Sequence, residues 1–120
     1  MVIQALARDT ALSVEDGLVY FPVPSTLAGF NLASAHVSVA TASSSGTPTF
    51  QLHNVTDSED MLSTAITIDA TETDSKDAAT APVVDTDHDD VAHGDILRLD
   101  CDVAGTGTKG CYLRLTFQEA

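Results

Sequence analysis

The chain of 120 residues contains no tryptophan, and its only aromatic residues are four phenylalanines and two tyrosines. Aromatic rings supply large, flat contact surfaces, so this composition argues against an extensive sugar-stacking platform. Basic residues are also scarce, with five Lys and Arg against 18 Asp and Glu, and the net charge is −13. Such a surface repels phosphate groups, which argues against nucleic acid and anionic membranes as partners.

The sequence also lacks a long apolar stretch. No run approaches the roughly 20 residues that a membrane-spanning helix needs. The first residues, MVIQALARDTALSVEDG, show no basic segment leading into an apolar one, so we expect no signal peptide and folding in a cytoplasm. A length of 120 residues suits one domain with a real hydrophobic core.

Cysteine is limited to Cys101 and Cys111. Both fall on the apolar face of alternating stretches, and a hairpin centred on Thr106 would pair one with the other. A cytoplasm keeps such thiols reduced, and free cysteine packs as a small apolar residue. The sequence therefore predicts buried free thiols, with a disulfide as the alternative.

Apolar and polar residues alternate with a period of two in five stretches, which is typical of strands with one buried face. The stretches are FNLASAHVSVA, TFQLHN, AITID, DILRLDCDV and GCYLRLTFQ. In the first, Ala33, Ala35 and Val37 share the expected inward face. Turn formers such as ASSSGTP and AGTGTKG separate the stretches. The pattern predicts an all-β protein, an antiparallel β-sandwich whose two sheets cover each other's apolar faces.

The two ends of the predicted sandwich are less regular. Residues 1–16 show no clean period, so they form either an N-terminal arm that orders on a partner or an ordinary edge strand. Residues 17–120 then make up the single β-sandwich domain. A short strand is expected at residues 80–84, and Pro82 places it at an edge because proline donates no ladder hydrogen bond.

The stretch from Val84 to Asp95, VDTDHDDVAHGD, holds five aspartates and two histidines and is called the acidic stretch below. Asp85, Asp87 and Asp89 match the first three ligand positions of a calcium loop. That loop then requires a glycine and a bidentate glutamate, and the chain has Asp90 and Ile96 there. A weak cation site at the three aspartates is therefore one hypothesis, and no resident metal is expected.

A structural interpretation of the acidic stretch is favoured. Asp87 would cap one helical turn from His88 to His93, and Gly94 would follow it in the left-handed conformation. Val91 and Ala92 would turn toward the core. On this interpretation the acidic stretch is a capped turn that leads into the strand ILRLDCDV.

No catalytic constellation stands out in the sequence. There is no G-x-S-x-G elbow, no phosphate loop and no H-E-x-x-H motif, and GTGTKG joins two strands as a turn would. His36 and His53 fall on the polar faces of their strands. We therefore expect a protein that is not an enzyme and uses no cofactor.

Four segments carry a resemblance to a known class of proteins: GFNL, FQLHNVTDSEDMLSTAITIDATET, DTDHDDVAHGDILRLD and GTGTKGCYLRLTF. Together they resemble small virion structural proteins of tailed phages, over roughly residues 20–118. The most specific parts run from Met61 to Asp69 and from Asp89 to Asp100. The resemblance implies a jelly-roll-like sandwich, found in capsid decoration (cement) proteins and in modules of tails and fibres. It implies no catalytic residues.

Within that class, a decoration role is the first expectation, because the chain has no repetitive shaft. The resemblance implies binding to the outer surface of the major capsid protein shell in the virion. Copies would cluster around a local symmetry axis as a homo-oligomer such as a trimer. Val2, Ile3 and Leu6 are the expected contacts with the capsid or a neighbouring copy. The alternative is a receptor-binding or carbohydrate-binding module of a tail or fibre.

Overall fold

The computed structural model covers residues 1–120 and consists of ten strands and two short 3-10 helices. In chain order these are β1 (Val2–Ala11), β2 (Glu15–Pro22), η1 (Ser25–Leu27), β3 (Phe30–Ser38), β4 (Thr49–Asn54), β5 (Glu59–Asp60), β6 (Leu62–Thr64), β7 (Ile66–Thr67), η2 (Ser75–Asp77), β8 (Val83–Val84), β9 (Ile96–Val103) and β10 (Lys109–Glu119). No helix has the length and apolar character needed to cross a membrane.

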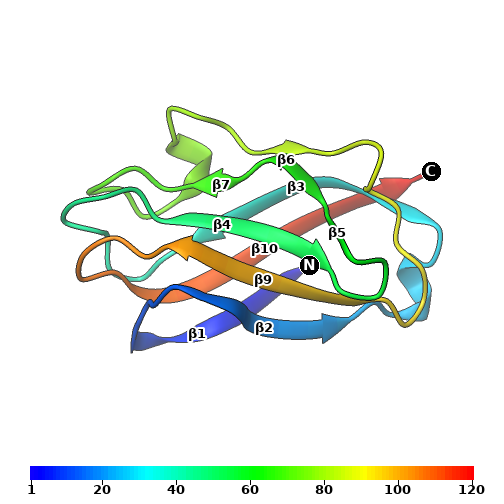
Figure 1. Ribbon diagram of the computed structural model, residues 1–120, viewed down its shortest axis with the longest axis horizontal. Coiled ribbons are helices and arrows are strands. Elements are labelled where there is room, and N and C mark those ends of the chain that lie inside the picture. Colours follow the sequence, from blue (N-terminus) through cyan, green and yellow to red (C-terminus); the bar gives the residue numbers. More distant parts are fainter.

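The long strands form two antiparallel sheets that lie face to face, as Figure 1 shows. Sheet A has the order β1-β10-β3, and sheet B has the order β2-β9-β4-β5, with β7 also paired to β4. A third, two-stranded sheet joins β6 and β8. Because β1, β3 and β10 lie in one sheet and β2, β4 and β9 in the other, the chain crosses the core repeatedly. This confirms the prediction of an all-β, antiparallel β-sandwich.

The core lies between the two sheets, and its members come mainly from the alternating stretches. Phe50 and Leu52 of β4, Leu97 and Leu99 of β9, and Leu113 of β10 are completely buried. Their strand neighbours point outward, as the period of two requires. The inward faces predicted for β4, β9 and β10 are confirmed, except that Val103, at the end of β9, is 43% exposed.

The hairpin predicted between the two cysteine-bearing strands is wrong. β9 pairs with β2 and β4 in sheet B, whereas β10 pairs with β1 and β3 in sheet A, so the connection at residues 104–108 crosses from one sheet to the other. Gly105 packs against the Ser43 side chain, and Thr106 donates its backbone N–H to Ser43 Oγ at 3.1 Å. These contacts hold the connection on the loop before β4 instead of folding it into a tight turn.

Two further details of the predicted strands differ from the structure. The register between β3 and β10 shifts between the pairs Thr116↔Ser34 and Phe117↔Leu32, so Ala33 is an extra residue in a bulge. As a result Leu32 is buried and Ala33 is exposed, the reverse of the predicted alternation. The strand expected at residues 80–84 is limited to β8, which begins directly after Pro82 and pairs with β6.

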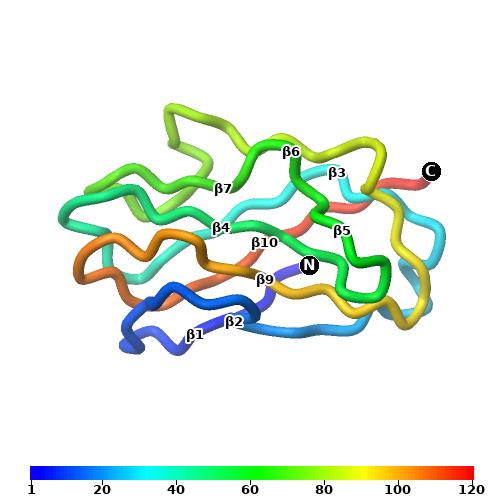
Figure 2. Tube along the Cα trace, viewed as in Figure 1, coloured from blue at the N-terminus to red at the C-terminus, as the bar shows by residue number.

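The first residues of the chain form a strand of sheet A and not a separate arm in this structure. β1 pairs only with β10, which makes it an edge strand, the second of the two alternatives considered for residues 1–16. The boundary expected at residue 16 falls inside β2. Figure 2 shows that β1 and β2 lie along one side of the sandwich, while the chain from β5 to β8 runs along the opposite side.

Candidate functional site

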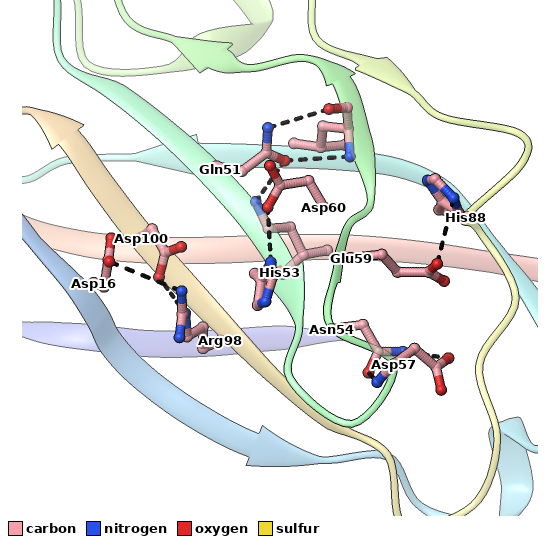
Figure 3. A network of polar contacts seen from close by, with 12 residues as sticks. Asp16, Gln51, His53, Asn54, Asp57, Glu59, Asp60, His88, Arg98 and Asp100 are labelled. Carbon is pink, nitrogen blue, oxygen red and sulfur yellow. Dashed lines mark hydrogen bonds and ion pairs between the residues drawn. The ribbon is translucent and has the colours of Figure 1, made fainter.

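A row of polar side chains crosses the outer face of sheet B from one strand to the next. The pairing of β2, β9 and β4 places Tyr20 beside Arg98, and Arg98 beside His53. His53 Nδ1 lies 2.7 Å from Asp60 Oδ1, which extends the row to β5 (Figure 3). Tyr20 is 56% exposed, and its ring lies so close to Gly17 that a Cβ there would overlap it.

Asp100 of β9 is almost buried and hydrogen-bonds to the Arg98 side chain of this row. Its carboxylate is 7% exposed and accepts hydrogen bonds from Arg98 Nε at 2.8 Å and from the Gly17 backbone N–H at 2.9 Å. The hydrogen bond to Asp100 raises the pKa of Arg98 above its usual value. Burial raises the pKa of nearby Asp102, and the negative charges of Asp100 and Asp16 act in the same direction. Asp100 therefore holds both the Arg98 side chain and the bend of β2 at Gly17.

The acidic stretch does not contain the predicted helical turn. The cap is Asp85 and not Asp87, since Asp85 Oδ1 accepts the Asp87 N–H at 3.0 Å and the Asp85 carbonyl accepts the His88 N–H at 2.9 Å. Asp90 then makes an isolated bridge to Asn31 of β3. The short side chains of aspartate favour such local caps over helix continuation. The acidic stretch is thus a turn followed by extended chain along β3.

The end of the acidic stretch is a second turn. Gly94 has φ +89°, as predicted, and Val91 is buried at 2% exposure, whereas Ala92 is exposed. Asp95 is buried and accepts hydrogen bonds from the Ala92 N–H at 3.0 Å and from Asn54 Nδ2 at 3.2 Å. These contacts give the motif VAHGD a structural role, since they tie the start of β9 to the end of β4.

The three candidate cation ligands do not converge on one point. Asp85 is engaged in its turn and also lies 3.1 Å from His88 Nδ1, while His88 Nε2 lies 3.3 Å from Glu59. Asp87 is exposed, and the backbone carbonyl of Asp89 accepts the Leu32 N–H. No group of three or more His, Cys, Asp or Glu side chains is arranged to hold a metal ion. The structure offers no support for a cation site in the acidic stretch.

Both cysteines are buried and free, as predicted, but they reach the core from opposite sheets. Burial raises the pKa of both Cys101 and Cys111 to about 12. Thiols with such a pKa carry almost no thiolate near neutral pH, so they lack the reactive form that nucleophilic or redox chemistry requires. The structure therefore gives them a packing role.

The three expected contact residues near the N-terminus have different environments. Val2 is 70% exposed, whereas Ile3 and Leu6 are partly buried and pack against the core. The difference follows from strand alternation, with a register shift between Gln4 and Leu6 that returns Leu6 to the inward side. Of the three, only Val2 is available to a partner without disturbing the sandwich.

One ion pair was not foreseen from the sequence. Arg114 of β10 forms two hydrogen bonds with the Asp74 carboxylate, at 2.8 and 2.9 Å. The hydrogen bond to Arg114 holds the pKa of Asp74 below its usual value. Next to it, Ser75 is buried and its Oγ lies 2.7 Å from His36 Nδ1 and accepts the Val37 N–H at 3.0 Å. Partners 40 residues apart leave no local signal in a sequence.

Charge is divided unequally between the two sides of the sandwich. The strands of sheet A carry three basic and two acidic side chains, so their net charge is +1. Because the whole chain has a net charge of −13, all the other residues together carry −14. Fourteen of the 18 acids lie between Asp57 and Asp102, outside the strands of sheet A, although Asp74 and Asp90 border its edge strand β3. The outer face of sheet A is thus nearly neutral on a strongly acidic protein.

The surface of the protein shows no pocket. Comparison with protein-family models, curated proteins and solved structures found no match to this chain.

Proposed function

We propose that this chain is a capsid decoration protein of a tailed phage, without catalytic activity, that binds the outer surface of the major capsid protein shell. The resemblance of residues 20–118 to small virion proteins motivates the proposal. The observation that carries it in the structure is the division of charge, with sheet A near neutrality and the other residues at −14.

The charge division suggests an orientation on the shell. The outer face of sheet A, which includes Val2 and Thr116, faces the capsid, and the acidic side faces the solvent. Acidic groups left in water keep their hydration, whereas burying them against a capsid would cost desolvation energy. A decoration protein that binds only the expanded shell stabilises that state by mass action.

The test uses expanded capsids of the encoding phage that lack this protein. Purified protein is added, and bound copies and the capsid melting temperature are measured. Wild-type protein should bind and raise the melting temperature. Thr116→Glu, on the exposed outer face of sheet A, should reduce occupancy, while the same substitution at exposed Thr86 in the acidic stretch should not.

Absence of wild-type binding would refute the decoration role. Equal occupancy by both variants, with wild-type protein bound, would refute only the orientation. The two parts of the proposal are therefore tested separately.

A second candidate function is a receptor-binding or carbohydrate-binding module of a tail or fibre. The observation in its favour is the exposed ring of Tyr20, flanked by Arg98 and followed across the sheet by His53 and Asp60. A sugar ring could stack on the tyrosine and bond to the charged groups. Glycan-array binding that is lost in Tyr20→Ala would favour this function over decoration.

A further inference from the structure

The two sheets have four long edges, and these differ in how far other parts of the chain already bond to the backbone groups along them. In sheet A the edge strand β3 is covered by other parts of the chain. Val37 and Val39 donate their N–H groups to Ser75 Oγ and the Thr73 carbonyl, and Leu32 donates to the Asp89 carbonyl. The Asp74–Arg114 ion pair fastens this cover to β10. No further strand can add at β3 without displacing it.

Both edges of sheet B are also closed. On the β4 side, β5 and β7 pair with the strand, and Met61 donates its N–H to the Leu52 carbonyl between them. On the β2 side, the Val23 N–H bonds to the Asp95 carbonyl. Because backbone hydrogen-bonding groups alternate in direction along a strand, those of Tyr20 and Pro22 point away from sheet B. Pro22 has no N–H, and the bend at Gly17 interrupts the strand, so β2 is a poor template for pairing.

The first residues of β1, up to the register shift between Gln4 and Leu6, are the one edge segment without such protection. The Leu115 N–H bonds to the Met1 carbonyl, so the alternation directs Ile3 toward β10 and leaves the backbones of Val2 and Gln4 pointing away from the sheet. Residues 1–7 contain no proline and no charged side chain. Natural proteins normally protect such edges with charge, proline or cover, and an edge without them is a site for strand addition.

We propose that this edge pairs with the same edge of a second copy of the chain, antiparallel about a two-fold axis at Ile3. Val2 of each copy then exchanges backbone hydrogen bonds with Gln4 of the other. The two three-stranded sheets A become one sheet of six strands. The contact is isologous, so it closes at two copies and occupies the edge of residues 1–5 in each.

Charge decides in favour of a second copy over a strongly charged partner. Two chains of −13 repel each other on every acidic side, but sheet A carries only +1, so repulsion is weakest where the β1 edges meet. A basic partner strand would find no opposite charge on residues 1–7, and an acidic one would find only the Met1 ammonium, which is already bonded to the Leu115 carbonyl. The inference rests on the strand edges alone and holds under either proposed function.

The test is sedimentation velocity over a concentration series, at low salt and at about 0.5 M salt, where the screening length falls to a few ångström. Wild-type protein should show a monomer–dimer equilibrium whose dissociation constant decreases with salt. Gln4→Pro removes only the outward N–H, so the bonds to β10 remain. Because two of four intermolecular bonds are lost, the dissociation constant should rise about tenfold or more. Gln4→Ala is the matched control and should change it less than about threefold.

Amide exchange by NMR provides a measurement without a variant. On dimerisation the Val2 and Gln4 amides should become protected, while the Ile3 amide, which faces β10, should be unchanged. A monomer at every concentration and salt, a trimer, or equal weakening by Gln4→Pro and Gln4→Ala would overturn the proposal. Protection of the two amides only on the capsid would show that the edge binds a different chain.

Discussion

The ion pair between Asp74 and Arg114 should make a measurable contribution to the stability of the fold, although it lies partly at the surface. Asp74 accepts both guanidinium hydrogen bonds and also caps η2 by accepting the Lys76 N–H at 3.0 Å. The Asp74 side chain is 17% exposed and that of Arg114 is 38% exposed. Because Arg114 is more than one-third exposed, water screens the pair, and we expect about 1 kcal/mol from it instead of the 3–5 kcal/mol of a buried pair.

Two substitutions separate the charge from the cap. Asp74→Asn keeps a capping side chain but loses the charge, so the free energy of unfolding should fall by about 1 kcal/mol. Asp74→Ala loses both and should cost about 2 kcal/mol. Asp77→Asn is the control, since Asp77 is exposed in the same helix and the net charge changes equally. Urea unfolding followed by far-UV circular dichroism measures all three, because the chain has no tryptophan.

The control gives the experiment its power to refute. If the only effect of Asp74 were its share of the −13 charge, removing it would relieve repulsion, and Asp74→Asn would be as stable as Asp77→Asn or more stable than wild type. That result would contradict the structural interpretation of the pair.

The pH dependence of the same pair has a definite sign. Arg114 lowers the pKa of Asp74 below 3.8 in the folded protein. A lowered carboxyl pKa means that its stabilisation is complete above the unfolded value and is lost as the pH falls through the folded value. The difference between wild type and Asp74→Asn should therefore be constant from pH 7 to about 5 and disappear only below about pH 4.

Three further outcomes follow from the core and the acidic stretch. Cys101 and Cys111 should not react with a thiol reagent in the native protein, and two thiols should titrate in denaturant without reductant; none would indicate a disulfide. Leu99→Ala should lower the free energy of unfolding by about 2–5 kcal/mol, as for a fully buried leucine, whereas Val103→Ala at the exposed end of β9 should change it by less than about 0.5 kcal/mol. Equal effects would contradict the burial of the two positions. Chelator and added calcium should leave the melting temperature unchanged. A calcium-dependent rise would instead support the hypothesis of a cation site at residues 84–95.

The sequence predicted the fold class because its strongest signal, the period of two, survives in the structure. In β9 and β10 nearly every predicted inward residue is buried, from Leu97 to Leu115. Pairing could not be predicted in the same way. Two neighbouring strands with one apolar face each satisfy the pattern equally well as a hairpin or on opposite sides of a core. Here the contact of Gly105 with Ser43 belongs to the crossing arrangement.

Side-chain contacts between distant segments could not be predicted from the sequence either. The helical turn predicted at His88–His93 with an Asp87 cap was wrong, and a turn capped by Asp85 precedes it instead, since several closely spaced aspartates offer the same local chemistry. Tyr20 alternates with the inward Phe21, so its exposure on the polar row of sheet B could have been predicted from the period of two. The Asp74–Arg114 pair depends on the path of the whole chain and could not.

The central claim, that the protein decorates a phage capsid, is tested most directly by its copy number in purified virions, measured by quantitative mass spectrometry against the major capsid protein. The proposal predicts a copy number comparable with that of the major capsid protein. A handful of copies would contradict it and indicate a tail or fibre component, and complete absence from the virion would refute both functions.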